Sequence, residues 1–251
     1  MSSVPDQSAA PSLRDGRGSE LGGSSGVRRV SVEEGYERWA ATYDTGPNPL
    51  LRLEERQLRR MLPRLEGRRV LDLACGTGRW LDWMLSQGAC LGVGVDFSPA
   101  MLAVAKQKPA LRHRLVRADC RAIPLASARF DLVILSFAVG HFRTLARVAG
   151  EVGRVAAPGA DLYVSDLHPL AYNQGWQTRF RDESGIVEIS TWPRTTAELL
   201  APWAAAGFEC TQMVECRFSK PERQVFSSAG KDHLFETYCS VPAVLACHFI
   251  R

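Results

Sequence analysis

The sequence has no long apolar run. No stretch of its 251 residues approaches the roughly 18 consecutive apolar residues that a helix needs to cross a bilayer. The N-terminus also lacks the apolar core of a secretory signal peptide. We therefore expect a soluble, cytoplasmic protein with no membrane insertion.

The sequence also lacks paired cysteines. Its seven cysteines are odd in number and none forms a Cys-x-x-Cys motif, which argues against a zinc ribbon and against a disulfide framework. Scattered free cysteines are typical of a reducing compartment, where they serve as small apolar residues. This usage agrees with the expected cytoplasmic location.

Neither sign of charge dominates. The chain has 31 Lys and Arg against 27 Asp and Glu, a formal net charge of +4, which is too small to demand a polyanionic partner. Arginines are concentrated in one region, namely Arg52, Arg56, Arg59, Arg60, Arg64, Arg68 and Arg69. Their helical spacing indicates either a solvated helix face or an RNA-contacting stripe. We favour the solvated face, so nucleic acid is not the expected partner.

Bulky apolar residues are almost absent from residues 1–30, where Ser, Gly, Asp and Arg dominate. A segment such as "GRGSELGGSSG" cannot bury enough apolar surface to offset the entropy cost of ordering. We predict a disordered tail over 1–30 and a single domain over 31–251, a length that can enclose one sizeable core.

The rest of the chain alternates between helical stretches and short apolar runs. Strands are predicted at Val70–Ala74, Leu91–Val95, His113–Ala118, Phe130–Ser136, Asp161–Ser165, Phe208–Glu215 and Ala243–Ile250. Helices are predicted over 50–65, 78–87, 98–107, 142–155 and 195–206. Apolar strands separated by helices indicate an α/β fold, a doubly wound and mostly parallel sheet with helices on both faces.

Two segments interrupt this alternation. No clear amphipathic helix is present over 216–242, so we expect a helix-free connection there and an antiparallel last strand. Residues 166–194 are irregular and rich in aromatic residues. Their length favours a functional insertion or lid.

A glycine turn follows the first predicted strand, in "RVLDLACGTGRW". Ligands of open α/β sheets bind at the carboxyl ends of the strands, and Gly76 and Gly78 allow the backbone to approach a ligand closely. Asp72 lies just before this turn. The dinucleotide fingerprint requires a third glycine where this chain has Leu81, so a nicotinamide-dependent dehydrogenase is the least favoured reading.

Two further acids follow the next two strands. Asp96 comes 20 residues after the glycine turn and suits a bond to a ribose diol, and Asp119 ends the third strand. Each of the acids could instead be structural, as a loop brace, a helix cap or a solvated strand end. Their shared position after three successive parallel strands predicts a ligand site.

These motifs resemble a known family. "VLDLACGTGRW", "VGVDFSPAML", "ADCRAIPLASARFDLVILSFAVGHF" and "VAAPGADLYVSD" are similar to consecutive motifs of the class I S-adenosylmethionine-dependent methyltransferases, especially the small-molecule group that includes the ubiquinone and menaquinone methyltransferases. The resemblance covers roughly residues 35–251. It implies a Rossmann-like, seven-stranded sheet with an antiparallel last strand, and S-adenosylmethionine as the cofactor.

The resemblance also implies the roles of several cofactor-binding residues. Asp72, Gly76 and Gly78 match the loop that holds the methionine moiety. Asp96 matches the acid that binds the ribose hydroxyls, with Phe97 beside the adenine.

Further roles follow from the same resemblance. Asp119 matches the residue that faces the adenine amino group, and Cys120 supplies an adjacent backbone amide. Ser136 lies where cofactor and acceptor meet. "YERWAATYD" resembles a helix that closes over the cofactor, so Tyr36 and Tyr43 are candidate lid residues.

Methyl transfer needs alignment more than acid–base chemistry, but an acceptor hydroxyl or acidic carbon can need a base. His141 is the first candidate, and it could equally cap a helix that starts near Phe142. His168 is the second candidate, with Asp166 as a partner. Its alternative role is in the turn ahead of Pro169.

Departures from other branches narrow the reaction. Ser136 stands where metal-dependent O-methyltransferases place a ligating acid, so no metal is expected. The chain lacks the Asn/Asp-Pro-Pro-aromatic motif of amide and adenine N-methyltransferases and the longer motifs of the quinone enzymes. We expect a partly apolar small-molecule acceptor, bound between the N-terminal helix, the 166–194 insertion and the 217–241 connection. The alternatives are a cofactor-binding protein that acts as a partner or regulator, and an RNA methyltransferase.

Overall fold

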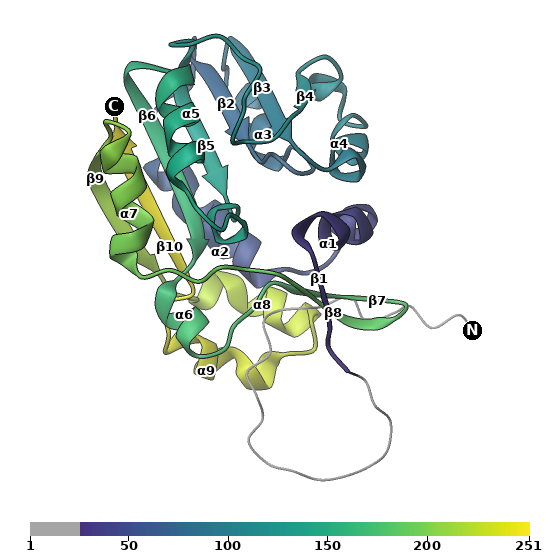
Figure 1. Ribbon diagram of the computed structural model, residues 1–251. Helices are drawn as coiled ribbons and strands as arrows, with labels where there is room; N and C mark the ends of the chain where they lie inside the picture. The colour runs from purple at the N-terminus through teal and green to yellow at the C-terminus, as the bar shows by residue number, and fades with distance from the viewer. Residues whose placement is uncertain (1–25) are drawn as a thin grey trace.

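A large twisted sheet forms the centre of the computed structural model, which describes residues 26–251. The sheet has seven strands in the order β4-β3-β2-β5-β6-β10-β9 (Figure 1). The strands are β2 (Arg69–Leu73), β3 (Leu91–Asp96), β4 (Leu115–Arg117), β5 (Phe130–Ser136), β6 (Ala156–Leu167), β9 (Glu209–Cys216) and β10 (Val244–Ile250). Each of the seven apolar runs in the sequence therefore forms a strand, and the predicted fold class is confirmed.

The sheet is parallel except at β10. This strand pairs antiparallel with β6 and with β9, for example with Val244 opposite Leu167 and Cys216. The antiparallel last strand is thus confirmed.

Helices cover both faces of the sheet, because alternate strand residues face two apolar cores. In β5, Leu132 and Ile134 face one core, and Val133 and Leu135 face the other. The first core is covered by α2 (Pro49–Met61), α3 (Arg79–Ser86), α8 (Lys220–Ser228) and α9 (Phe235–Cys239). The second core is covered by α5 (Ala146–Val155) and α7 (Thr196–Ala205).

Shorter helices complete the sheet domain. They are α4 (Pro99–Ala105), α6 (Pro169–Asn173) and the 3₁₀ turns η2 (Pro109–Leu111), η3 (Val139–His141) and η4 (Asp232–Leu234). Local sequence explains the start of α4, where the Ser98 hydroxyl accepts a hydrogen bond from Met101 N and Pro99 occupies the first turn.

The prediction of a helix-free 216–242 connection is wrong. Helices α8 and α9 occupy it, and α8 starts with a Ser-x-x-Glu signal in which the carboxylate of Glu222 accepts from Ser219 N at 2.9 Å. Phe226 and Tyr238 from these helices pack with Trp176 in the first core. The helices were missed because they are short and their apolar residues are mostly aromatic, which weakens the periodic pattern.

A second, three-stranded sheet corrects two further predictions. It consists of β1 (Arg28–Val30), β8 (Gly185–Ile189) and β7 (Arg179–Asp182), so the 166–194 segment is a helix and a hairpin instead of irregular chain. Because β1 pairs in parallel with β8, residues 28–30 belong to the folded domain. The rest of the predicted tail, residues 1–25, lies outside the described residues.

The N-terminal helix packs on this small sheet. Helix α1 (Val32–Trp39) and the turn η1 (Ala40–Thr42) follow β1 directly, and Trp39 stacks on Phe180 of β7 with ring centroids 5.0 Å apart. Contacts with α4 on the other side place α1 between the hairpin and the large sheet (Figure 1). In the part of the chain that the structure describes, no helix has the length and apolarity needed to span a bilayer.

Backbone strain is concentrated at the carboxyl ends of the central strands. Ala74, directly after β2, has φ of 56°, and Phe137, directly after β5, has φ of 50°. Residues with a side chain rarely adopt this left-handed region, and such outliers often lie at functional sites. Ala128 has a similar φ of 52° but lies in the turn before β5, at the opposite end of that strand.

We expect Ala74→Gly to increase the free energy of unfolding by about 1 kcal/mol, because glycine adopts positive φ without steric cost. Ala128→Gly should give a similar gain, whereas Ala149→Gly inside α5 should destabilise by up to about 1 kcal/mol. Urea unfolding of the three variants measures these changes. A loss of stability in Ala74→Gly would contradict the assignment of strain to this residue.

Candidate active site

A cavity of about 620 Å³ opens at the carboxyl ends of β2, β3 and β5. Most of the residues that the sequence singled out line it together: Tyr36, Tyr43, Asp72, Gly76, Asp96, Phe97, Asp119, Cys120, Ser136 and His141. Two of the predicted site residues, Gly78 and His168, do not line it. The parallel sheet explains the convergence, because the carboxyl ends of its strands share one edge.

The two glycines of the turn have different roles. Gly76 has φ of +54° and lies in the cavity wall, and a side chain at this position would meet no close atom except Met101 Sδ at 3.9 Å. Its N–H donates to Asp96 Oδ2 at 2.7 Å. Gly78 has φ of +75°, and a Cβ at this position would collide with Leu111. Gly78 therefore allows helix α3 to pack closely, and only Gly76 faces the cavity.

Asp72 presents a buried carboxylate to the cavity. It is 2% exposed, and its Oδ2 accepts from Leu81 N in the first turn of α3 at 2.9 Å. Burial raises the pKa of Asp72 to about 7, against the opposing effects of that hydrogen bond and of the Arg79 guanidinium. A cation bound beside Asp72 would restore the ionised form.

The next two strands place Asp96, Phe97 and Asp119 at the other end of the cavity. The carboxylate of Asp96 accepts from the backbone amides of Gly76 and Ser98 and thereby joins the two loops, while burial raises its pKa. Phe97 is 45% exposed, so its ring is available to a flat ligand. Asp119 bonds the guanidinium of Arg121, which holds the pKa of this carboxyl below its ordinary value.

The side chain of Cys120 is buried in the same wall. Burial raises the pKa of its thiol to about 12, so the side chain is neutral and unreactive at physiological pH.

One buried carboxylate behind the cavity wall was not predicted from the sequence; it binds three residues that line the cavity, Arg79, Trp80 and Ser136. Glu54 of α2 is fully buried, and its carboxylate accepts from Arg79 Nη2 at 2.8 Å, Trp80 Nε1 at 3.2 Å, Ser136 Oγ at 2.6 Å and Ser165 Oγ at 2.7 Å. The signal was present in the sequence, since Glu54 shares the apolar face of its helix with Leu58. It was masked by the surrounding charged residues.

His141 lies at the junction of three segments that are far apart in the sequence. Its Nδ1 is 3.2 Å from the carbonyl oxygen of Ser190, and its Nε2 is 2.8 Å from the hydroxyl of Tyr36. A carbonyl can only accept, so Nδ1 carries the proton, and Nε2 accepts the hydrogen bond from Tyr36. Burial lowers the pKa of His141, which favours this neutral form. The alternative role as a helix cap is wrong, because α5 starts at Ala146.

His168 lies outside the large cavity and caps a helix. It is the N-cap of α6, where its Nδ1 accepts from Leu170 N at 3.1 Å, and its Nε2 lies 3.3 Å from Glu215 Oε1. Asp166 does not contact it. The carboxylate of Asp166 accepts from Gly140 N at 2.7 Å and from the Tyr172 hydroxyl at 3.3 Å, on the His141 side of the strand.

Hydrogen bonds of Asp44 hold the segment after η1 against the glycine turn. Asp44, just after η1, accepts from the hydroxyl of Thr77 at 2.8 Å and from Lys108 Nζ at 3.0 Å. Lys108 also donates to the carbonyl of Thr77 at 2.6 Å. These bonds hold Tyr43 against the cavity, and burial raises the pKa of its hydroxyl to about 12.

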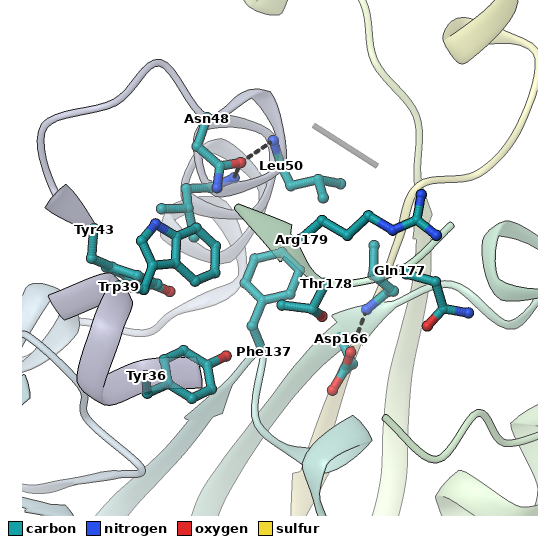
Figure 2. A pocket seen from close by; sticks show the side chains of 12 residues that line it. Tyr36, Trp39, Tyr43, Asn48, Leu50, Phe137, Asp166, Gln177, Thr178 and Arg179 are labelled. Atoms are coloured by element: carbon teal, nitrogen blue, oxygen red, sulfur yellow. Dashed lines mark hydrogen bonds between the residues drawn. The ribbon is translucent and has the colours of Figure 1, made fainter. Parts of the chain in front are cut away.

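A smaller cavity of about 40 Å³ adjoins the large one. Tyr36, Tyr43 and Phe137 line both cavities. Figure 2 shows Phe137 between the aromatic side chains of the N-terminal segment and Asp166, which lies with Gln177 and Thr178 on the far side. These three aromatic side chains therefore lie between the two spaces. No residue of the 217–241 connection lines either cavity within the described chain.

Comparison with known proteins agrees with this geometry. Residues 70–159 match a family model described as a methyltransferase domain. Demethylmenaquinone methyltransferase of Thermus thermophilus is 40% identical over 107 residues, which cover 41% of this chain and 48% of that protein. The chain thus spans about half the length of this relative.

Two other comparisons cover more of the chain. Malonyl-[acyl-carrier protein] O-methyltransferase of Pseudescherichia vulneris is 30% identical over 181 residues, 66% of this chain and 70% of that protein. The structure of an S-adenosylmethionine dependent methyltransferase from Mesorhizobium loti superimposes with a TM-score of 0.62 at 22% identity and covers 79% of this chain and 98% of that one. Because a relative is matched over 70% of its length and the sheet has the fold expected from the motifs, the chain belongs to the class I S-adenosylmethionine-dependent methyltransferases.

Proposed function

We propose that this protein transfers a methyl group from S-adenosylmethionine to a small-molecule acceptor. The observation that carries the proposal is the cavity of about 620 Å³ at the carboxyl ends of three parallel strands, which is lined by carboxylates and by aromatic side chains. Its volume lies within the range of about 300–1,000 Å³ that is usual for cofactor and ligand pockets.

The residues present fit this cofactor. Asp72 offers a carboxylate to the methionine ammonium group, and Asp96 lies where a ribose diol can donate to it. Phe97 and Asp119 suit the face and the amino group of adenine. The positive φ of Gly76 leaves the cavity wall open beside them. All five line the cavity. In the proposed orientation the methionine end of the cofactor would lie toward Ser136 and the adenine end toward Arg121.

The bound cofactor supplies an electrophilic methyl group on a sulfonium, so the protein's task is alignment. Rigid positioning of two reactants can contribute roughly 7–11 kcal/mol to lowering a barrier. The N-terminal segment contributes by covering the cavity with Tyr36 and Tyr43, which excludes water. The ion pair of Asp44 with Lys108 keeps this cover in place.

The proposed acceptor end of the cavity is largely aromatic, with Glu33 and Arg143 as the charged residues near it. Tyr36, Phe137, Phe142 and Trp192 line it together with His141. This lining supports a partly apolar acceptor of modest size. The relatives' names, demethylmenaquinone and malonyl-[acyl-carrier protein] methyltransferase, also describe enzymes whose acceptor groups are small organic molecules or acyl groups.

His141 is the proposed general base for an acceptor that must lose a proton. The Ser190 carbonyl holds the proton on Nδ1, so the lone pair of Nε2 is directed into the cavity toward Tyr36. An acceptor hydroxyl that replaces the Tyr36 contact could transfer its proton to Nε2.

The RNA methyltransferase alternative has less support. Arg56 is bound by the buried Glu222 at 2.6 Å, and Arg59 pairs with Glu55 at 2.5 Å. These arginines are therefore partly neutralised by partners within the fold. Salt-sensitive RNA binding that weakens in Arg60→Ala would restore this alternative. Cofactor binding without transfer to any fraction of a cell extract would instead favour a regulatory role.

Asp96→Ala should weaken S-adenosylmethionine binding roughly tenfold or more, because hydrogen bonds to a charged group contribute about 1.5–3 kcal/mol. Isothermal titration measures the affinity, and circular dichroism verifies that the variant is folded. Glu66→Ala removes an exposed carboxylate outside the cavity and should leave the affinity unchanged. Full affinity in Asp96→Ala would overturn the assignment of the ribose site.

Cofactor affinity should rise with pH and level off above about pH 7. The pKa of Asp72 is about 7 in the free protein, so the carboxyl is mostly protonated at pH 6, and binding of an ammonium group must release that proton. Affinity should change by nearly tenfold per pH unit below pH 6. Asp72→Asn should bind more weakly and with a flat profile. An unchanged profile in this variant would show that another group titrates.

His141→Ala should lower turnover by roughly 100-fold or more, the usual contribution of a positioned base, while cofactor affinity stays within about twofold. Because the pKa of His141 is lowered, turnover at saturating cofactor should persist below pH 6.5 and fall only as the ring becomes protonated. Transfer of labelled methyl groups to a small-molecule extract measures turnover, with the exposed His233→Ala as control. Equal turnover in both variants would remove the base role.

A further inference from the structure

A guanidinium group lies beside Asp72 in the cavity wall. Arg79 is the first residue of α3, lines the cavity, and is close enough to Asp72 to lower the pKa of that carboxyl. No role was assigned to it from the sequence. Its position next to a carboxylate gives this end of the cavity one group of each charge.

Arg79 is held by one of its two terminal nitrogens. Nη2 donates to Glu54 Oε2 at 2.8 Å and to Ser136 Oγ at 3.2 Å, and the guanidinium carbon lies 5.0 Å from the centroid of the Trp80 ring. The other nitrogen, Nη1, is buried and has no hydrogen-bond partner among the described residues. An unpaired buried donor on a charged group is costly, so such an atom indicates that an acceptor is supplied from outside the chain.

Glu54 explains why the guanidinium has a fixed orientation. A fully buried carboxylate is strongly unfavourable unless it is paired and hydrogen-bonded, and Glu54 meets both conditions through Arg79, Trp80 and two serines. With these bonds formed, Nη1 of Arg79 still has no acceptor among the described residues. A guanidinium that is anchored on one side and unpaired on the other suits a carboxylate ligand.

We propose that Arg79 binds the α-carboxylate of the cofactor's methionine moiety while Asp72 binds its α-ammonium group, and that Glu54 is the positioning residue for Arg79. This inference rests on the proposed function, since it names the groups that hold one part of the proposed cofactor. A carboxylate on the acceptor could also reach a guanidinium. The methionine moiety is favoured because it carries both charges, and the cavity wall offers a partner for each side by side.

The test compares two ligands that differ only in the carboxylate, S-adenosylmethionine and decarboxylated S-adenosylmethionine. Isothermal titration should show that the wild-type protein binds the first at least tenfold more tightly. In Arg79→Met this ratio should fall to near one, because the affinity for the full cofactor drops and that for the decarboxylated ligand does not. A variant that lost affinity for both ligands equally, with the ratio preserved, would overturn the proposal.

Two control variants separate the carboxylate contact from general damage to the cavity. Asp72→Asn should weaken both ligands alike, because both retain the ammonium group. Arg121→Met removes an arginine at the opposite end of the same cavity and should leave the ratio unchanged. A ratio that collapsed in Arg121→Met as well would show an effect of net charge and overturn the specific contact.

Glu54→Gln tests the positioning role. Glutamine preserves the size of the side chain and a carbonyl oxygen for the serine hydroxyls, but it removes the charge that anchors Arg79. The ratio should fall severalfold while the affinity for the decarboxylated ligand is kept. If Glu54→Gln does not fold, Glu54→Asp provides the test, because the shorter side chain keeps the charge but withdraws it from Arg79 and should give an intermediate ratio.

The remaining outcomes distinguish this inference from the proposed function. Failure of the wild-type protein to bind either ligand would overturn the proposed function and this inference with it. Binding of both ligands with equal affinity would overturn only this inference. An unchanged ratio in Arg79→Met, together with lost methyl transfer to carboxylate-bearing molecules of a cell extract, would assign Arg79 to the acceptor and overturn the cofactor contact.

Discussion

The buried carboxylate of Glu54 connects the parts of the protein that must stay in register. It extends from α2 into the first core and accepts hydrogen bonds from the start of α3, the end of β5 and the end of β6. An ionised group at 0% exposure would destabilise the fold if any of these donors moved away. The carboxyl ends of the central strands and the first turn of α3 are therefore held in one arrangement. The residues of the cavity wall, which belong to these segments, have fixed positions as a result.

The cover of the cavity is built differently. Helix α1 and the β7–β8 hairpin lie far apart in the sequence, yet they share a small core in which Val30, Phe180 and Ile189 are buried. Each forms a hydrogen bond with the His141 ring: α1 through the Tyr36 hydroxyl, and the segment after β8 through the Ser190 carbonyl. Arg38 of α1 also links the helix to the hairpin, because its Nη2 donates to Asp182 Oδ2 at 2.5 Å. The same unit that covers the cavity therefore supplies both hydrogen-bond partners that fix the tautomer of His141.

Charged residues are concentrated in two separate parts of the cavity wall. Asp72 and Arg79 line the same cavity as Ser136, and Arg79 is near enough to lower the pKa of Asp72, whereas Asp119 forms an ion pair with Arg121 next to Cys120. Aromatic rings and a neutral histidine line the proposed acceptor side. Such an arrangement suits a zwitterionic amino-acid group, a flat base and a partly apolar acceptor, each against a wall of matching chemistry. The strained backbone at Ala74 and Phe137 lies on the same wall, where two strand ends turn sharply to leave room for a ligand.

The sequence by itself determined the sheet, its helices and most of the cavity lining. Apolar runs at fixed intervals specify strands regardless of their partners, and a glycine or an acid directly after a strand must lie at the shared carboxyl edge. Local pattern therefore identified Asp72, Asp96, Asp119 and His141 as candidates. The antiparallel β10 followed from the family resemblance, because the helix-free connection that also pointed to it is occupied by α8 and α9. Local pattern failed for α8 and α9, whose aromatic residues at irregular spacing are buried only because Trp176 and Phe218 lie opposite them.

Only the tertiary structure decided which residues meet across large sequence separations. Glu54 is an ordinary charged helix residue until β5 and β6 bring Ser136 and Ser165 to it, at separations of 82 and 111 residues. His141 and His168 are both candidate bases in the sequence, in that order, but packing makes His168 a helix cap beside Glu215 and places His141 in the cavity wall. Periodicity reports which side of an element is buried, whereas the identity of the opposing atoms depends on how distant elements pack.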